Sequence, residues 1–472
     1  MLAVLLLGQF MGLVDVLVVN VAMPAIGADL QAGGAALQLV VGGYTVAYAM
    51  LLITGARLGD LYGRRRMYLL GVIGFTLTSL ICGFAPNTEV LVTFRFIQGA
   101  AAAVMVPQIM SVIQINFAGP ARAKALSAYA VVLSTGALVG LIVGGVLVSA
   151  DLFGYSWRPV FLVNVPIGLF LAILVPRVLP ADQPRHQRRL DFAGLAIATA
   201  AVCLIVLPLV LGHEVDWPAW TFVCIAAGLV LAALFVPVER RIAARGGDPL
   251  VNLDVLHAPA MSAGILTLAA MQITYGGFLF VFTLHQQAGL GHSALRTGLT
   301  YIPMSAAFGL AGFYWRKLPT AIHHLLAPTG LALCALAYLG IAGSTGGGPL
   351  TWVSLVLAGV GTGLSASPVL TQALVRVPLA QAADASGLLT TTVQLGQVVG
   401  VAVFGTVFLT LAGSVTPGES TVHAYESALT TTGYWLAALA VVGVGAGLAL
   451  ARALVRVHRA AAGEGVVAAA NA

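Results

Sequence analysis

Long apolar runs follow one another along nearly the whole chain and are separated by short polar stretches. An α-helix needs about 20 predominantly apolar residues to cross the hydrocarbon core of a bilayer. Fourteen runs of that kind lie at 3–26, 36–55, 67–86, 89–113, 124–149, 157–177, 192–212, 219–238, 260–284, 294–315, 320–343, 350–374, 385–412 and 429–454. The pattern therefore predicts an all-α membrane protein with about 14 transmembrane helices.

Composition supports the same fold class. Of the 472 residues, 60% are hydrophobic and only 8% are charged, whereas soluble globular proteins carry about 25% charged residues. Lipid must therefore cover most of the surface. The four cysteines lie singly in apolar runs without C-x-x-C spacing, so the sequence predicts neither a metal site nor disulfides. It also has no phosphate loop, nucleophile elbow or zinc-binding helix, and we predict that it is not an enzyme.

The basic residues indicate how the chain is oriented. Suppose that the amino terminus is cytoplasmic and that successive helices cross the membrane in alternating directions. The inner loops and their edges then hold 19 of the 22 Lys and Arg residues, and the other three are Arg95, Arg158 and Arg296. Inner loops carry such an excess in membrane proteins. We therefore predict a multi-pass protein of the cell (plasma or inner) membrane with both termini in the cytoplasm. Topology explains the net charge of +6 better than nucleic-acid binding does.

The longest inner loop, about 239–259, divides the chain after eight predicted helices. Fourteen helices divide naturally as six, two and six. The expected organisation is an N-terminal six-helix bundle at 1–178, two accessory helices with the inner linker at 179–259, and a C-terminal six-helix bundle with a short cytoplasmic tail at 260–472.

A basic motif fills the loop between the predicted helices 36–55 and 67–86. It reads Gly55-Ala-Arg-Leu-Gly-Asp60-Leu-Tyr-Gly63-Arg64-Arg65-Arg66. A carboxylate such as that of Asp60 can cap a neighbouring helix or pair with arginine, and Gly63 permits a tight turn. The alternative is a basic loop that only sets topology.

This segment resembles the major facilitator signature G-x-x-x-D-R-x-G-R-R. Ala56 stands at the first glycine, with Gly55 just before it, and Leu61 replaces the usual basic residue. The resemblance implies a gating role for the residues of this motif, namely Gly55, Asp60, Gly63, Arg64 and Arg65.

Other segments resemble one family within this superfamily, the fourteen-helix drug:proton antiporters. Residues 15–24 (DVLVVNVAMP) are similar to its signature D-x-T-V-V-N-x-A-L-P, with leucine in place of the threonine. Residues 95–99 (RFIQG) are similar to R-x-x-Q-G, and residues 157–168 to W-R-W-x-F-x-I-N-x-P-x-G. Residues 385–400 resemble a later pattern of the family. The resemblance implies a major facilitator fold of two six-helix bundles plus two accessory central helices.

A glycine stripe marks the predicted helix 124–149. Gly136, Gly140 and Gly144 recur every four residues, and Gly145 lies beside them. This spacing places small residues on one face, where a second helix can approach closely. The stripe resembles the antiporter motif that ends G-P-x-x-G-G, but Leu141 occupies the proline position. A hinge-like role and a static packing face both remain open.

Two charged residues are expected inside the membrane. Asp15 lies near the middle of the first predicted helix, where a carboxylate costs about 2.5–3.5 kcal/mol on insertion scales. Burial disfavours its charged form, so the carboxyl group can exchange a proton. Arg95 lies about six residues into the helix 89–113. We hypothesise that Asp15 carries a coupling proton and that Arg95 adjusts its proton affinity; a permanent structural pair is the alternative.

Aromatic side chains provide candidates for substrate binding. Tyr44 and Tyr48 share one helix face, Tyr275 and Tyr301 lie in two later helices, and Gln98 shares the face of Arg95. These five side chains could line a cavity for lipophilic molecules, although aromatic residues more often simply pack. His285 is interpreted as an interfacial histidine without a coupling role.

The sequence thus predicts a proton-driven exporter of lipophilic small molecules (drugs, antibiotics or endogenous toxic metabolites) that works by alternating access. Its expected partners are substrate, protons and membrane lipid; we expect no nucleic acid, no metal and no cofactor beyond the proton gradient, and a functional monomer. A lipid exporter or a proton-coupled uptake symporter would share this fold. A non-transporting scaffold is least favoured, because it has no need for an acid in the middle of the membrane.

Overall fold

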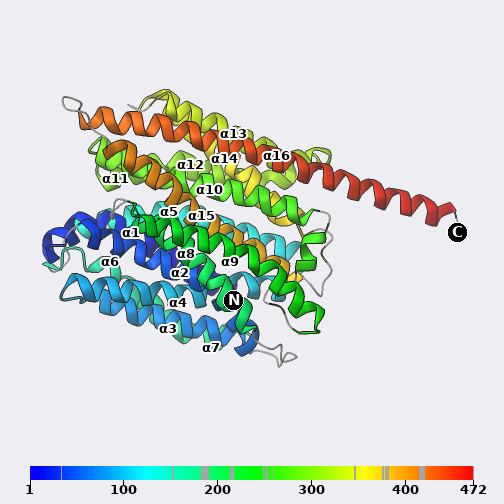
Figure 1. Ribbon diagram of the computed structural model, residues 1–472, viewed down its shortest axis with the longest axis horizontal. Helices are drawn as coiled ribbons and strands as arrows, with labels where there is room; N and C mark the ends of the chain where they lie inside the picture. Colours follow the sequence, from blue (N-terminus) through cyan, green and yellow to red (C-terminus); the bar gives the residue numbers. More distant parts are fainter. Residues whose placement is uncertain are drawn as a thin grey trace. The chain divides into compact units, whose positions relative to one another are not determined.

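The computed structural model describes residues 1–32, 34–150, 154–181, 191–212, 217–247, 249, 253–258, 260–344, 347–374, 377, 382–413 and 420–470. Within these residues the regular secondary structure is helical throughout (Figure 1). The first helices are α1 (Leu2–Leu30), α2 (Gly34–Tyr62), α3 (Arg64–Gly83), α4 (Thr88–Asn116), α5 (Gly119–Ser149), α6 (Pro159–Leu162), α7 (Asn164–Val178), α8 (Phe192–Leu211) and α9 (Ala219–Ala244). The later ones are α10 (Met261–Leu284), α11 (Ala294–Thr300), α12 (Ile302–Tyr314), α13 (Leu326–Ala342), α14 (Pro349–Gln372), α15 (Ala382–Gly413) and α16 (Thr421–Ala470).

The predicted all-α membrane fold is confirmed. Each of the fourteen apolar ranges overlaps one helix or two consecutive helices. Among the described residues, ten helices are long and apolar enough to cross a membrane, and α2, which bends by 50° between Leu52 and Thr54, makes eleven. The other three ranges fall on α5, on α8, whose apolar part is shorter, and on the broken pair α11–α12.

The helix ends differ from the apolar ranges. The helix α2 continues to Tyr62, seven residues beyond the range 36–55, and α3 already begins at Arg64. Backbone hydrogen bonding does not depend on hydropathy, so a helix can extend past the hydrocarbon core into the polar interface. The basic motif therefore lies mostly on the ends of two helices rather than in a loop.

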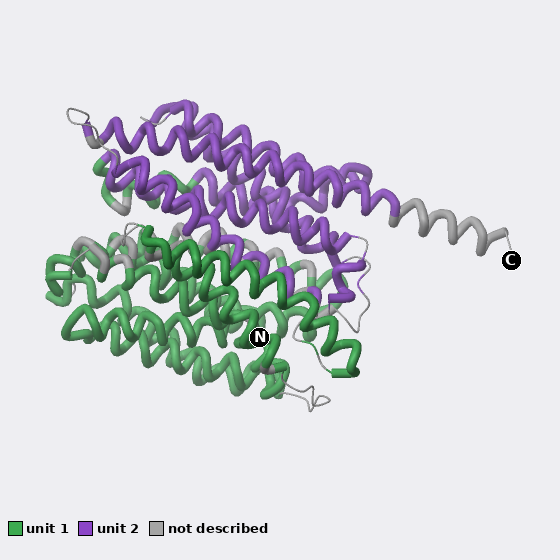
Figure 2. Tube along the Cα trace, viewed as in Figure 1, with its two compact units in different colours: residues 1–251, 291–302 green, residues 252–290, 303–472 purple. Residues whose placement is uncertain are grey.

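The chain forms two compact units (Figure 2). Unit 1 comprises residues 1–251 and 291–302, and unit 2 comprises residues 252–290 and 303–472. In unit 1, α2 packs on α4, α1 on α5, and α3 on both α4 and α7. The two helices α8 and α9, expected to be accessory, belong to unit 1, where they pack on each other and α8 packs on α2.

Glycines allow the backbones of α2 and α4 to touch. A Cβ atom built on Gly55 would lie 1.9 Å from the carbonyl oxygen of Ala103, and one on Gly99 would lie 2.2 Å from that of Tyr44. Neither position has room for a side chain. This contact brings the polar residues of α4 directly against the backbone of α2.

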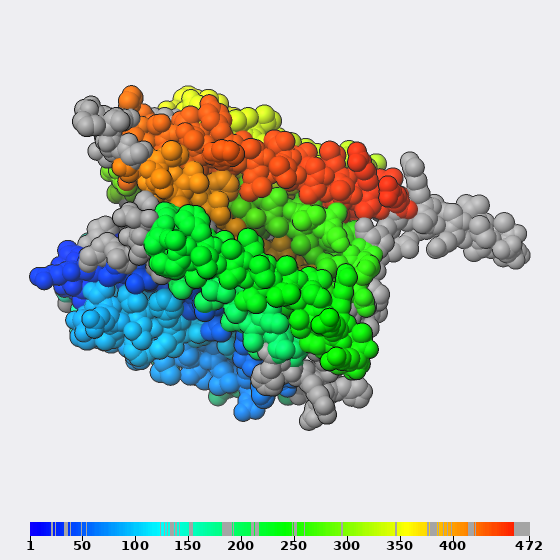
Figure 3. Space-filling model, in the orientation of Figure 1, coloured from blue at the N-terminus to red at the C-terminus, as the bar shows by residue number. Residues whose placement is uncertain are grey.

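The surface of α9 is largely apolar and exposed, with Phe222, Val223 and Val230 each more than half exposed. In the space-filling view, α9 lies on the face toward the reader (green; Figure 3). Exposed apolar helix faces of this kind are covered by lipid in a membrane protein.

In unit 2, α10 packs on α14, α15 and α16, and α13 packs on α14 and α16. Its core includes Met271, Leu331 and Val369. The helix α10 continues into a π-helical turn, His285–Gly289, and the His285 side chain is buried. His285 therefore lies inside the protein rather than on its surface, and its placement at the membrane interface without a coupling role stays a prediction.

Candidate functional site

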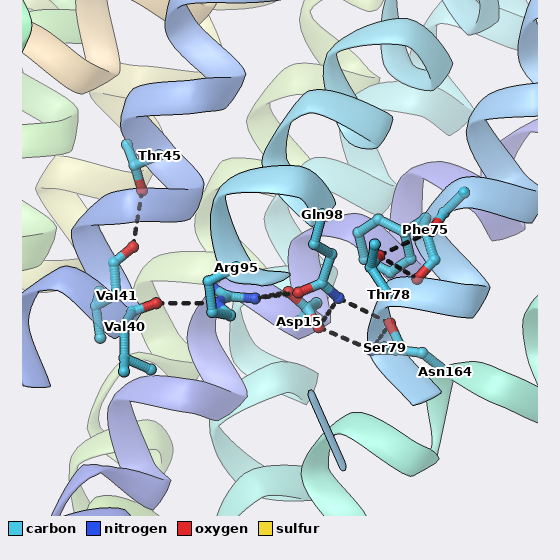
Figure 4. Close-up of polar contacts among 11 residues, drawn as sticks. Asp15, Val40, Val41, Thr45, Phe75, Thr78, Ser79, Arg95, Gln98 and Asn164 are labelled. Carbon is cyan, nitrogen blue, oxygen red and sulfur yellow. Dashed lines mark hydrogen bonds and ion pairs between the residues drawn. The ribbon is translucent and has the colours of Figure 1, made fainter. Parts of the chain in front are cut away.

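An ion pair lies in the interior of unit 1. Asp15 on α1 and Arg95 on α4 have side chains with 0% exposure, and the Arg95 Nη1 atom donates to Asp15 Oδ2 at 2.6 Å (Figure 4). Moving each charge out of water costs several kcal/mol, and a buried pair offsets this cost only when further hydrogen bonds satisfy the remaining atoms. Those hydrogen bonds come from other helices.

Three polar side chains complete what we call the Asp15 network (Asp15, Ser79, Arg95, Gln98 and Asn164). Gln98 Nε2 donates to Asp15 Oδ1 at 2.9 Å and to Ser79 Oγ at 2.7 Å. Asn164 Nδ2 donates to Asp15 Oδ1 at 2.8 Å and to Ser79 Oγ at 3.4 Å. Arg95 Nη1 also donates to Gln98 Oε1 at 2.7 Å. All five side chains are buried.

Backbone and aromatic groups hold the guanidinium of Arg95 in place. Its Nε atom donates to the carbonyl oxygen of Val40 at 2.8 Å. The Cζ atom lies 4.6 Å from the ring centroid of Tyr44 and 5.6 Å from that of Phe161. Aromatic faces attract cations, more strongly when water is excluded. The arginine is therefore fixed from α2, α4 and α6 together.

The local sequence explains how four helices bring these groups together. Arg95 and Gln98 are three residues apart on α4 and so share one face. Asn164 is the first residue of α7, immediately after the break that separates it from α6 at Val163. Ser79 lies on α3, which packs on both α4 and α7.

The network fits an ionised carboxylate. Every recorded hydrogen-bond partner of Asp15 is a donor, two at Oδ1 and one at Oδ2. A protonated carboxyl group would need an acceptor at one of these oxygens. The arrangement can therefore stabilise the negative charge of Asp15, and it would have to change if the residue took up a proton.

The basic motif forms a second polar cluster at the adjoining ends of α2 and α3. Asp60 Oδ1 accepts from Arg64 Nη2 at 2.6 Å, and its Oδ2 atom lies 3.8 Å from Arg57 Nη1. Gly63 has a φ of 95° at the start of α3, a conformation that favours glycine. Arg65 Nη2 donates to the carbonyl oxygen of Pro176 at 2.6 Å, which ties α3 to the end of α7.

The glycine stripe of α5 faces α1. Gly136, Gly140, Gly144 and Gly145 are buried. A Cβ atom on Gly136 would lie 3.1 Å from Leu13 Cδ1, and one on Gly140 would lie 3.2 Å from Val14 Cα. Gly136 and Gly140 thus pack against the segment of α1 that carries Asp15.

Comparison of the sequence with known protein families assigns the chain to one of them. The sequence model of the Major Facilitator Superfamily matches residues 5–401. The chain belongs to the Major Facilitator Superfamily. The Asp15 network and the basic motif both lie within the matched range.

Several curated relatives in the superfamily are named as exporters or resistance proteins. The chain is 38% identical to the probable actinorhodin transporter of Streptomyces coelicolor, covering 88% of this chain and 73% of that protein. It is 36% identical to the cephamycin export protein CmcT of Amycolatopsis lactamdurans, with 87% and 84% covered. It is 30% identical to the puromycin resistance protein of Streptomyces alboniger, with 94% and 88% covered.

Solved structures of superfamily members share the fold. A bacterial homologue of the human lysosomal transporter Spinster, in an inward-facing and occupied conformation, aligns with a TM-score of 0.64 and 17% identity over 96% of this chain and 97% of that one. The human organic anion transporter MFSD10 aligns with a TM-score of 0.61 and 16% identity over 94% and 98%.

The five residues proposed for substrate binding fall in different surroundings of this major facilitator fold. Gln98 and Tyr44 are buried in or against the Asp15 network, and Tyr48 stacks on Tyr44 with ring centroids 6.1 Å apart. Tyr275 packs on Phe308 in unit 2, and Tyr301 is buried in unit 1.

Sequence reasoning missed two members of the network, Ser79 and Asn164. Asn164 stands in the quoted W-R-W-x-F-x-I-N pattern and was given no role, and Ser79 belongs to no quoted motif. An uncharged polar residue inside a predicted span was the available signal, because it needs a partner there. The sequence does not say which partner, since Ser79 and Asn164 reach Asp15 only through tertiary packing.

The first prediction concerns the basic motif of this superfamily member. Asp60→Asn keeps the size of the side chain but removes the charge that pairs with Arg57 and Arg64. We expect normal membrane insertion and transport slowed by about fivefold, because the partly exposed ion pairs contribute roughly 1 kcal/mol. The measurement is initial transport rate in vesicles matched for protein amount. Unchanged rates would reduce the motif to a topology signal.

Proposed function

We propose that this protein exports lipophilic small molecules, such as antibiotics or endogenous toxic metabolites, and that an inward proton gradient drives the export. The buried Asp15–Arg95 pair is the observation that carries the proposal. A charge inside the membrane is costly and marks a functional site by default, often a proton relay in transporters. The curated relatives add the direction, since they are named for export and resistance.

In the proposed cycle, Asp15 alternates between a charged and a neutral form. The ionised form binds Arg95 and is only 1% exposed in the present structure. Proton exchange with water on either side therefore requires a conformational change, as alternating access supplies. Proton uptake removes the attraction that holds α1 to α4 and so changes the relative stability of the two access states.

Substrate binding and assembly are proposed as follows. We propose that the rings of Tyr44, Tyr48, Tyr275 and Tyr301 contribute to a lipophilic binding surface. Two six-helix bundles, 1–178 and 260–472, would rock about a midplane site, with α8 and α9 accessory. We further propose a functional monomer that needs only substrate, protons and lipid.

Inverted membrane vesicles provide the direct test. Vesicles that contain the protein are energised with an imposed proton gradient and given a panel of dyes and antibiotics. We expect accumulation that stops when a protonophore collapses the gradient, and none in vesicles without the protein. Accumulation only in right-side-out vesicles would indicate an uptake symporter, and movement of labelled phospholipid instead of the panel would indicate a lipid exporter.

The second prediction tests the proposed orientation in the plasma membrane. In a chain freed of its four native cysteines, a cysteine replaces either Ser420, before α16, or Ala244, at the end of α9, both exposed. We expect an impermeant maleimide added to intact cells to label the Ser420→Cys protein strongly and the Ala244→Cys protein at background level. Permeabilised cells should label both, which controls for accessibility. The reverse pattern would overturn the cytoplasmic placement of the termini.

A further inference from the structure

Two buried polar atoms of the Asp15 network have no hydrogen-bond partner among the described residues. They are Arg95 Nη2 and Asn164 Oδ1. A buried polar atom without a partner is costly and needs an explanation. Here one unused donor and one unused acceptor lie in the same site, beside a carboxyl group that changes its own hydrogen-bonding capacity with each proton.

Asn164 Oδ1 is the acceptor that remains without a partner when Asp15 is ionised and accepts its three hydrogen bonds. Gln98 Oε1 already accepts from Arg95, and Ser79 Oγ accepts from Gln98. The amide nitrogen of Asn164 points at Asp15 Oδ1 at 2.8 Å. This orientation is required chemically, because an amide oxygen there would face a carboxylate oxygen.

We propose that Asn164 senses the protonation state of Asp15 by rotating its side-chain amide. This inference rests on the proposed function, in which Asp15 takes up the coupling proton. A proton from water binds Asp15 Oδ1 and creates an O–H donor where Asn164 now places an N–H donor. Half a turn of the amide about χ2 exchanges Nδ2 for Oδ1, and the oxygen accepts the new O–H. No proton leaves the amide.

The position of Asn164 makes this rotation consequential for the backbone. It begins α7 directly after the break at Val163, and Phe161 on the preceding helix α6 lies against the Arg95 guanidinium. After rotation, the amide nitrogen occupies the place where the oxygen has no partner in the present structure. The neutral form therefore carries a surplus donor, and movement at the α6–α7 junction can relieve it.

The other titratable groups near Asp15 come from three helices. Arg95 of α4 contacts it directly. Tyr44 of α2 and Cys82 of α3 lie within electrostatic range of both Asp15 and Arg95. From α7, the uncharged amide of Asn164 contacts the carboxylate. The two amide side chains that contact Asp15 are those of Gln98 and Asn164. The Gln98 oxygen already accepts a hydrogen bond from Arg95, so the Asn164 oxygen is the available acceptor for a protonated Asp15.

The third prediction follows from removing this amide. Asn164→Leu takes one donor from the ionised carboxylate and one acceptor from the neutral form. Hydrogen bonds to a charged group are roughly twice as strong as neutral ones, so the ionised form loses more. The pH midpoint of Asp15 protonation should therefore move to higher pH by about one unit, a tenfold change in proton affinity.

Infrared difference spectroscopy of the purified protein during a pH titration measures this without transport. In the wild type we expect the carboxyl C=O band and an asparagine amide band to change with one common midpoint. Asn164→Leu should lose that amide change and show the shifted midpoint; Asn164→Ala serves the same purpose if leucine prevents folding. The control is Asn116→Leu, because the Asn116 amide donates to the Val112 carbonyl at the end of α4 and is not part of the Asp15 network. Both wild-type signals should persist in this variant.

Two results would overturn the inference. One is a wild-type amide band that does not respond to pH, and the other is an unchanged midpoint in both Asn164 variants. Asp15→Asn separates this failure from failure of the proposed function. If the carboxyl band that shares its midpoint with the amide change survives in Asp15→Asn, Asp15 is not the proton carrier. If that band disappears there but the Asn164 variants have no effect, only the inference on Asn164 fails.

Discussion

Replacing Asp15 by asparagine is expected to abolish uphill export. The variant retains the shape of the side chain but has no group that binds and releases a proton, so a pH gradient has no means of driving the substrate. Substrate-for-substrate exchange can continue. The measurement is accumulation of a transported drug in proteoliposomes with an imposed proton gradient, and we expect the Asp15→Asn signal to fall to that of empty liposomes.

The same substitution should also lower stability, which the sequence alone would not suggest. Neutralising a lone acid in the membrane favours burial, but Arg95 is itself fully buried and loses its counter-charge. Removing one partner of a buried pair costs about 3–5 kcal/mol. We expect a lower melting temperature for Asp15→Asn, and recovery of the melting temperature without recovery of transport in the neutral double variant Asp15→Asn/Arg95→Gln.

A second acid on the same helix provides the control. Asp29 lies near the end of α1, is 43% exposed and pairs with Arg158 at 3.2 Å. Asp29→Asn should retain uphill export, since that carboxylate is in contact with water. Wild-type uphill export by Asp15→Asn would exclude Asp15 as the sole coupling group and turn attention to Asp60 and His285.

Gly140→Leu is expected to have the other large effect. A Cβ atom at Gly140 would already lie 3.2 Å from Val14 Cα and 3.1 Å from Leu17 Cβ, and leucine adds three more carbons against the backbone of α1. Overpacking of this kind costs about 1–3 kcal/mol and occasionally more. We expect poor yield of folded protein or a folded form that does not transport, because α1 and its Asp15 are displaced. The measurements are size-exclusion profile, melting temperature and vesicle transport.

Two further glycine variants serve as controls for Gly140→Leu. Gly140→Ala needs a shift of only a few tenths of an ångström and should be nearly normal. Gly445→Leu, on an exposed position of α16 with no atom within 4 Å of a Cβ, should be fully normal. A stable and active Gly140→Leu protein would mean that the stripe does not pack on α1 in the working transporter.

The sequence predicts the two charged residues of the Asp15 network better than its uncharged members. Asp15 and Arg95 stand out because charge is rare and costly inside apolar runs, and their pairing needed only that α1 and α4 be neighbours. Asn164 and Ser79 give a weaker signal, because an uncharged polar residue in a membrane helix indicates that it needs a hydrogen-bond partner but does not indicate which one. Trp157 is similar: its motif was visible, but only the structure shows its Nε1 atom donating to Asp29 Oδ2 at 2.9 Å.

Helix boundaries and units required tertiary information as well. Hydropathy locates the apolar part of α2 but not its continuation to Tyr62, which carries Asp60. The assignment of residues 291–302 to unit 1 arises because α11 packs on α5, a contact between segments more than 140 residues apart. Apolar periodicity describes single helices, and it contains no information about such a pairing.

The complete burial of the Asp15–Arg95 pair also has a consequence for proton leak through the proposed transporter. Water reaches neither charge in the present conformation, since Asp15 is 1% and Arg95 0% exposed. In this conformation Asp15 can exchange a proton with water only after the surrounding helices open. Any futile proton leak is then set by how often the helices open without substrate rather than by the acidity of the carboxyl group. If Asp15 carries the coupling proton as proposed, substitutions that loosen the packing around α1 should increase proton leak before they reduce transport.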